Sequence, residues 1–233
     1  MNNPNDGRNE IPSSLSKNPD GTFKVTQTQV RWGVFTTSGY HPNQIATYNQ
    51  KQLAAKGYMQ SPNDWKNTEI TGYVKLNKGP SDQFTWYARG GTHTSSRACE
   101  GTSIKGQLFF DGHTRYAKEQ WHPGGYSFTK TQSAVSSIQG RWVGFKTAVY
   151  NFQENGKTVV KMENWVDDKN NNNWVKIYDF VDRGGFGNEG GHCGGDPDQL
   201  ITWGGPIATF RWDQATDVDI KNMSVREIQP PVS

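Results

Sequence analysis

The sequence predicts an all-β sandwich of two antiparallel sheets, with one short helix. Apolar and polar residues alternate with period two over much of the chain, as strands with one buried face require. The 26 glycines and 11 prolines supply many turns. Nine Trp, nine Tyr and 11 Phe residues offer large areas to bury, although only 32% of the residues are hydrophobic. A chain of 233 residues can form one such sandwich with its own core.

The chain shows no internal repeat and no interior linker. We expect a polar tail over residues 1–21 and a single domain over residues 22–233. Residues 49–56 are the one helical candidate, because good helix formers precede Gly57 there. No apolar run reaches the length of a membrane-spanning helix, so we expect no membrane insertion. The first 20 residues lack the apolar segment of a signal peptide.

The charge balance limits the partners. The formal net charge is +3, and no block of five or more Lys or Arg residues occurs. Nucleic-acid binding depends on such a basic footprint, so we exclude nucleic acid as a partner. We expect a monomer. Its weak positive charge is compatible with an anionic polysaccharide and also with a neutral one.

The first strands are expected at residues 69–76 and 84–89, where apolar side chains occupy every second position. Their inward-facing positions are Ile70, Gly72, Val74, Leu76, Phe84, Trp86 and Ala88.

A hairpin is expected at Asp111-Gly112, which lies between two patterned strands. If these two residues form the turn, Phe110 faces His113, and the register of the pair follows. The side chains that then share one face are Lys105, Gln107, Phe109, Tyr116, Lys118, Gln120 and His122. This face is either a solvated surface or a binding floor, and its long polar side chains favour a binding floor.

Three later strands show the same division into two faces. The core side is expected to carry Val143, Phe145, Thr147, Val149, Val160, Met162, Val166, Val175, Ile177 and Val181. The opposite side is expected to carry Trp142, Lys146, Tyr150, Lys161, Glu163, Trp165, Trp174, Lys176 and Tyr178.

Five strands thus carry an aromatic residue among charged neighbours on one side. Flat rings suit the C–H faces of sugars, and charged or amide groups suit their hydroxyls. The alternative is that these aromatic residues stack across strands for stability alone. We expect a polysaccharide groove formed by Tyr87, Arg89, Lys105, Gln107, Tyr116, Lys118, Trp142, Lys161, Glu163 and Trp165.

Three loops carry further candidates. Cys99 and Cys193 are predicted to form a disulfide, which implies an oxidising, extracellular or cell-surface location; the alternative is two free thiols. Asp168, Asn170 and Asn172 alternate as oxygen ligands do in a calcium loop, although a long hairpin loop uses the same residue types. We expect no required cofactor, with a structural calcium ion as the one candidate.

Two segments, residues 65–76 and 217–228, resemble the outer strands of concanavalin A-like jelly rolls. Three motifs are similar to those of alginate lyases and glucuronan lyases, in the same chain order. They are SSRACEG with Arg97, KEQWH with Gln120 and His122, and GFKTAVYN with Lys146 and Tyr150. The resemblance departs from the family at Ala148, where those lyases have Gly, and in the long segment that follows Tyr150.

The resemblance implies β-elimination of a uronate polysaccharide. Arg97 and Gln120 would neutralise the carboxylate, which acidifies the neighbouring proton. His122 would be the base or would orient it, and Tyr150 would be the acid, the base or both. Lys146 would bind the anionic chain or lower the pKa of Tyr150. The chemistry requires these side chains to converge on one point.

Two alternatives remain open. One is a noncatalytic, lectin-like domain on the same fold, because jelly rolls host both functions. The other is a glycoside hydrolase, which needs two facing carboxylates. Glu119 points away from the expected groove, so we rank the hydrolase below the lyase.

Overall fold

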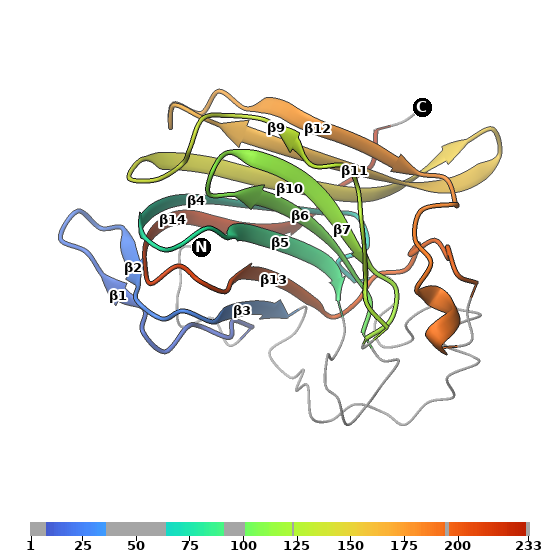
Figure 1. Cartoon of the computed structure of the whole chain (residues 1–233), viewed down its shortest axis with the longest axis horizontal. Helices are drawn as coiled ribbons and strands as arrows, with labels where there is room; N and C mark the ends of the chain where they lie inside the picture. Colours follow the sequence, from blue (N-terminus) through green and yellow to red (C-terminus); the bar gives the residue numbers. More distant parts are fainter. Residues whose placement is uncertain (1–7, 36–63, 91–100, 123, 194–195, 232–233) are drawn as a thin grey trace.

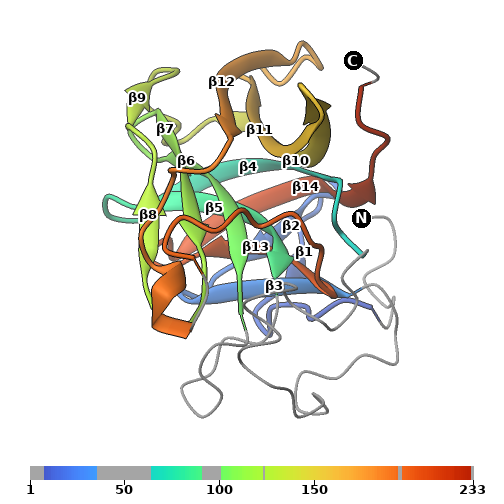
Figure 2. The same cartoon turned by 90° about the vertical axis from the view of Figure 1, so that its right-hand side faces the viewer.

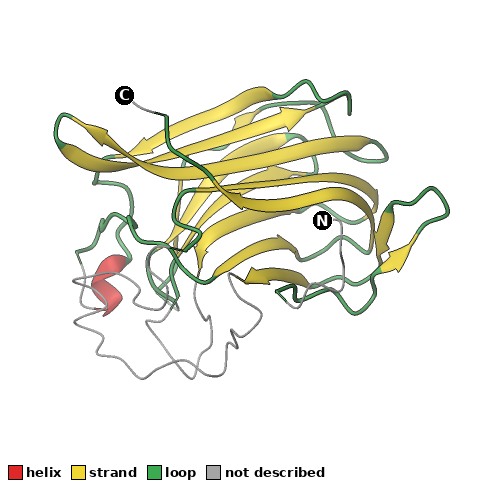
Figure 3. Ribbon diagram, turned by 180° about the vertical axis from the view of Figure 1, so that it is seen from behind, coloured by secondary structure: helices red, strands yellow, loops and turns green. Residues whose placement is uncertain are grey.

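The computed structural model describes residues 8–35, 64–90, 101–122, 124–193 and 196–231. These residues form two seven-stranded antiparallel sheets that pack face to face (Figure 1). The predicted all-β jelly-roll sandwich is therefore confirmed. The helix expected at residues 49–56 lies outside the described residues, and the helix drawn in Figure 3 is a short 3-10 segment, Gly190–Cys193. In the described parts of the chain no helix is both long and apolar enough to span a bilayer.

Both sheets assemble strands that are distant in the sequence, and Figure 2 shows the two layers from the side. Sheet A has the order β3 (Val30–Phe35), β13 (Ile207–Trp212), β5 (Gln83–Gly90), β6 (Ser103–Phe109), β7 (His113–Glu119) and β8 (Tyr126–Phe128), and β9 (Gln132–Ser133) also pairs with β7. Sheet B has the order β1 (Ser16–Lys17), β2 (Phe23–Val25), β14 (Asp217–Glu227), β4 (Thr68–Lys78), β10 (Trp142–Glu154), β11 (Lys157–Asp167) and β12 (Val175–Asp182).

Part of the expected polar tail belongs to these sheets. β1 pairs with β2 of sheet B. The amide of Glu10 donates a hydrogen bond to the Gly33 carbonyl, and the amide of Phe35 donates one to the Arg8 carbonyl. The β-structure therefore begins before residue 22.

The core lies between the sheets and contains the residues that the alternation predicted. Trp86 on β5 packs against Phe84, Phe145 and Phe210. Its indole N–H also donates a 3.1 Å hydrogen bond to the Phe145 carbonyl on β10, which links the two sheets. Burying these aromatic side chains supplies much of the hydrophobic stabilisation of the sandwich.

A buried polar contact also joins the sheets. Thr147 on β10 donates to the Asn164 side-chain oxygen at 2.8 Å, and the Asn164 amide donates to Thr114 on β7 at 2.9 Å. Gly106 on β6 lies against this cluster, and a Cβ at that position would come within 2.2 Å of the Thr147 hydroxyl. The glycine therefore allows the two sheets to approach closely here.

The predicted register of the β6–β7 hairpin is wrong by one residue. Phe110, Asp111 and Gly112 form a three-residue turn, in which the Gly112 amide donates to the Phe109 carbonyl and Gly112 has a φ of +92°. Lys105 therefore pairs with Ala117 and Gln107 with Arg115. Because side chains alternate along a strand, this shift moves Tyr116, Lys118 and Gln120 to the opposite face.

β12 also departs from the predicted alternation. Tyr178 pairs with Asn164, whereas Lys176 pairs with Trp165, so Ile177 is an extra residue at a β-bulge. Tyr178, expected on the polar face, is buried in the core, and Val181 pairs with the outward-facing Lys161. Val175, expected in the core, is 56% exposed.

Substitution Gly106→Ala tests the close approach of the sheets. The added methyl group must displace Thr147 and Asn164, so we expect a loss of about 3 kcal/mol in the free energy of unfolding. Urea denaturation measures this loss. Gly191→Ala is the matched control, because a Cβ at Gly191 meets no atom within 4 Å. Equal urea midpoints for the two variants would contradict the packing described here.

Candidate functional site

The outer face of sheet A, which points away from the core, carries a row of polar side chains. Antiparallel pairing aligns Arg211 of β13 with Thr85 of β5, Thr85 with Gln107 of β6, and Gln107 with Arg115 of β7. A second row runs beside it, through Tyr87, Lys105, Ala117 and Phe128 of β8. Side chains from five neighbouring strands therefore meet on one surface.

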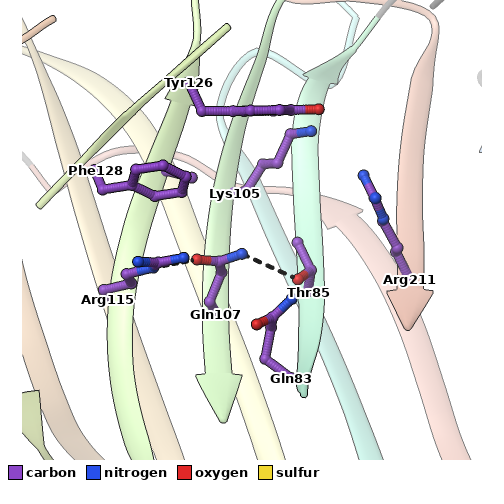
Figure 4. A pocket seen from close by; sticks show the side chains of 9 residues that line it. Gln83, Thr85, Lys105, Gln107, Arg115, Tyr126, Phe128 and Arg211 are labelled. Carbon is purple, nitrogen blue, oxygen red and sulfur yellow. Dashed lines mark hydrogen bonds between the residues drawn. The ribbon is translucent and has the colours of Figure 1, made fainter. Parts of the chain in front are cut away.

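These rows enclose a pocket of about 180 Å³, here called the Arg115 pocket (Figure 4). The side chains of Tyr126 and Phe128 are 41% and 47% exposed and stand over it. The complete lining is Gln83, Thr85, Lys105, Gln107, Arg115, Ala117, Tyr126, Phe128 and Arg211.

Lys105 is held rigidly at one end of the pocket. It is 2% exposed, and its ammonium group lies 2.9 Å from Glu119. The same group lies 4.9 Å from the centre of the Tyr87 ring and 4.4 Å from that of Tyr126. The two rings and the carboxylate together compensate the buried charge.

Arg115 differs from the other cations of this face. Its Nε–H donates a 2.7 Å hydrogen bond to Gln107, and its guanidinium lies 4.0 Å from the centre of the Phe128 ring and 5.1 Å from that of Phe109. Within the described residues, no carboxylate pairs with Arg115 and its terminal N–H groups have no hydrogen-bond partner. Burial lowers the pKa of Arg115, which reflects a charge that is partly removed from water without a counter-ion.

Arg211 is compensated by a carboxylate. Its Nε–H donates to Asp213 at 2.8 Å, and Arg31 binds the other oxygen of Asp213 at 2.5 Å. Burial raises the pKa of Tyr126, and Glu119 adds to that shift, whereas Arg211 opposes it. The Tyr126 phenol therefore stays protonated near neutral pH and can donate a hydrogen bond.

Four of the predicted binding and catalytic residues are instead structural. Tyr116 and Lys118 are fully buried between the sheets, and Lys118 binds Asp182 at 2.7 Å. Gln120 is also buried; its amide donates to the Pro197 carbonyl at 2.7 Å and its oxygen accepts from the Glu189 amide at 2.9 Å. The Arg89 side chain points inward and donates to the carbonyls of Lys66 and Ile201. Burial lowers the pKa of Arg89 to about 9.

The predicted site residues of β10 and β11 lie on the outer face of sheet B, on the opposite side of the sandwich. Tyr150 donates to Glu163 at 3.4 Å, and burial together with that carboxylate raises the pKa of Tyr150 to about 12. Lys146 lies 3.7 Å from Glu69, and Lys161 pairs with Asp179. Trp142 and Trp165 lie under lysine ammonium groups on the same face.

The expected catalytic constellation therefore does not converge. His122 follows β7 of sheet A and contacts Glu119 at 3.2 Å, whereas Tyr150 and Lys146 project from the far face of sheet B. The core separates the two groups. Period-two alternation predicts whether a side chain faces the core or the outside, but it does not predict which of the two sheets its strand joins.

Arg97 and Cys99 lie outside the described residues, as does the side chain of Cys193, so the disulfide stays a prediction.

Hydrogen bonds and an ion pair within the protein hold the asparagine-rich loop, residues 167–174, in place. Asp167 accepts the Asn171 and Asn172 amides and the Tyr73 hydroxyl. Asp168 pairs with Arg141 at 2.7 Å, and the Asn172 side-chain oxygen accepts from the Trp174 indole. The described residues contain no group of three or more His, Cys, Asp or Glu side chains that could hold a metal ion. Arg141 and the Trp174 indole thus each occupy one oxygen of the candidate ligands Asp168 and Asn172, and the structural calcium ion stays a prediction.

Sequence reasoning identified Tyr87, Lys105 and Gln107 on the pocket face and missed Arg115, Tyr126, Phe128 and Arg211. Arg115 would have been found by allowing a three-residue turn at Asp111-Gly112, since Arg115 then pairs with Gln107. The strand with Tyr126 and Phe128 is only three residues long and carries little periodic signal.

Comparisons with known proteins show distant structural similarity. No protein-family model and no curated protein matches the chain. Sheep galectin-11 in complex with glycerol matches with 12% identity and a TM-score of 0.39, over 69% of this chain and 90% of the galectin chain. Scytalido-glutamic peptidase with a transition state analog inhibitor matches with 10% identity and a TM-score of 0.33, over 73% of this chain and 77% of the peptidase chain. Similarities this low carry no functional argument.

Substitution Lys105→Met tests the charge balance of the pocket floor. It removes the ammonium group that lies 2.9 Å from the buried Glu119 carboxylate, so we expect a loss of about 3 kcal/mol in the free energy of unfolding. The double variant Lys105→Met/Glu119→Gln should recover part of that loss, because it also removes the buried negative charge. Urea denaturation of the single and double variants gives the coupling energy. Strictly additive losses would contradict a direct Lys105–Glu119 interaction.

Proposed function

We propose that the chain is a noncatalytic domain that binds an acidic polysaccharide in the Arg115 pocket. The observation that carries this proposal is Arg115 itself, a half-buried guanidinium with no carboxylate partner in the described residues. A carboxylate or sulfate group of a sugar would accept two hydrogen bonds from its terminal N–H groups.

The other pocket groups suit the uncharged parts of a sugar. Tyr126 and Phe128 expose ring surface at the pocket, where the C–H face of a pyranose can pack. Gln83 and Thr85 supply an amide and a hydroxyl at the floor, within reach of sugar hydroxyls. One unpaired cation among aromatic and amide groups favours a polymer whose sugars carry one acidic group.

The arrangement supports binding more than β-elimination. Elimination requires an acid and a base within hydrogen-bond reach of one sugar. Tyr150 and His122 lie on opposite sides of the core, and Gln120 is bonded to the loop that contains Pro197. The two lysines assigned to the elimination and to sugar binding, Lys146 and Lys118, are likewise on different faces of the sheets.

Substitutions Arg115→Ala and Phe128→Ala test the pocket. We expect Arg115→Ala to weaken binding of polygalacturonate or alginate oligomers at least about tenfold, because one charge-assisted pair is lost. Phe128→Ala should weaken it about fivefold, through the lost ring surface. Isothermal titration calorimetry and affinity electrophoresis measure both effects.

Two matched variants serve as controls. Arg183→Ala removes an exposed arginine that pairs with Glu154, and Val175→Ala removes an exposed apolar side chain outside the pocket. Both should bind as the unmodified chain does. Wild-type affinity in Arg115→Ala would contradict the proposal, and so would the appearance of unsaturated uronate absorbance during incubation with these polymers.

A further inference from the structure

A second, larger pocket opens on the opposite side of the molecule, on the outer face of sheet B. It has a volume of about 570 Å³ and lies over β4, β10 and β14, beside the asparagine-rich loop that precedes β12. We call it the Trp174 pocket, after the indole that forms part of its wall. The Arg115 pocket lies on the far side of the core, so the two pockets share no lining residue.

The Trp174 ring is held in a fixed orientation. Its indole N–H donates to the Asn172 side-chain oxygen at 3.1 Å, and Tyr73 contacts it edge to face with the ring centres 5.5 Å apart. A Cβ at Gly144 would come within 2.7 Å of the ring, so the glycine allows the indole to lie against β10. A half-buried, fixed indole is a preformed surface for the apolar face of a ligand.

Polar groups beside the ring are free to bind a ligand. In the described parts of the chain the side chains of Asn170, Asn222 and Ser224 have no hydrogen-bond partner, and all three line the pocket. Asn170 and Asn222 have φ values of +53° and +51°, a conformation that asparagine tolerates better than most residues. Two amides and a hydroxyl offer both donors and acceptors.

Both cations of this pocket contact one carboxylate, that of Glu69. Arg226 donates to Glu69 at 2.6 Å, and Lys146 lies 3.7 Å from the same carboxylate. The Lys146 ammonium also lies 4.6 Å from the centre of the Trp174 ring. Each charged side chain of the described lining therefore has a partner, and the groups without one are uncharged, in contrast to the Arg115 guanidinium.

From these contacts we infer that the Trp174 pocket is a second binding site, specific for a neutral, hydroxyl-rich saccharide. A pyranose ring packs on the indole, and its hydroxyls bind Asn170, Asn222 and Ser224. A chain with both sites bridges a neutral glycan on one face and an acidic polysaccharide on the other. The bridging rests on the proposed function of the Arg115 pocket, whereas the neutral site does not.

Binding of the neutral polysaccharides laminarin, mannan and dextran tests the site by affinity electrophoresis and calorimetry. We expect at least one of them to bind, with an affinity that added salt does not reduce, because no net charge is neutralised. Trp174→Ala should weaken that binding at least about tenfold. Asn222→Gly, which retains the backbone conformation, should weaken it about threefold through the lost amide contacts.

The controls separate this site from the Arg115 pocket. Asn155→Gly changes another asparagine with positive φ, at +51°, that does not line the pocket, and it should bind as the unmodified chain does. Arg115→Ala should leave neutral binding intact while it loses acidic binding. Circular dichroism verifies the fold of each variant, and Asn222→Gly decides the outcome if Trp174→Ala does not fold.

Two results would overturn the neutral site. The first is that none of the three neutral polymers binds the unmodified chain. The second is that neutral binding persists in Trp174→Ala and Asn222→Gly but is lost in Arg115→Ala. Either result leaves acidic binding at Arg115 standing. A third result is that the unmodified chain binds no acidic polysaccharide, while Trp174→Ala still weakens neutral binding. That result would contradict the proposed function and the bridging, but it would support the neutral site.

Discussion

Gly112, with its φ of +92°, closes the turn between β6 and β7 and thereby sets which side chains of both strands face solvent. Few other residues adopt this conformation without strain. A Cβ at Gly112 would also come within 2.1 Å of the Val135 carbonyl oxygen. The turn places Gln107 opposite Arg115 and leaves Lys118 in the core beside Asp182. With a two-residue turn these faces would exchange. The Arg115 guanidinium would then lie in the core, and Lys118 would no longer pair with Asp182.

The inner faces of the sheets hold both outer surfaces in place. Trp86 bonds to the backbone of β10, and Asn164 bonds to Thr114 across the sheet interface. Each pocket is therefore built largely on paired strands rather than on loops, which limits the motion of its side chains. The same packing separates the two outer faces, so residues from different sheets cannot cooperate on one sugar unless they lie at a rim.

The sequence predicted which side chains are buried in the core. It predicted much less well which exposed side chains share one face of the molecule. Alternation correctly placed Phe84, Trp86 and Phe145 in the core, because each strand buries one face. It placed Lys105 and Tyr150 on solvent-facing surfaces, but it carried no information on which sheet each strand joins. The two residues consequently lie on opposite sides of the molecule. Pairing between strands that are distant in the sequence decides which sheet a strand joins, and the local sequence pattern does not show this pairing.

Small departures from regular geometry account for the other differences. One extra turn residue reversed the predicted faces of Tyr116 and Lys118, and one extra residue at Ile177 reversed that of Tyr178. The pairing of Lys118 with Asp182 joins residues 64 positions apart, so neither residue alone predicts it. Two motifs that resemble a lyase, KEQWH and GFKTAVYN, follow each other in the order of that family, but they belong to different sheets.

The most direct test of acidic-polysaccharide binding is nuclear magnetic resonance of the labelled chain during titration with polygalacturonate oligomers. The Nε–H signal of Arg115 and the amide signals of β6, β7 and β8 should shift together, while those of β11 and β12 stay in place. Saturable shifts confined to β10, β11 and β12, or no shift of the Arg115 signal at saturation, would contradict binding in the Arg115 pocket.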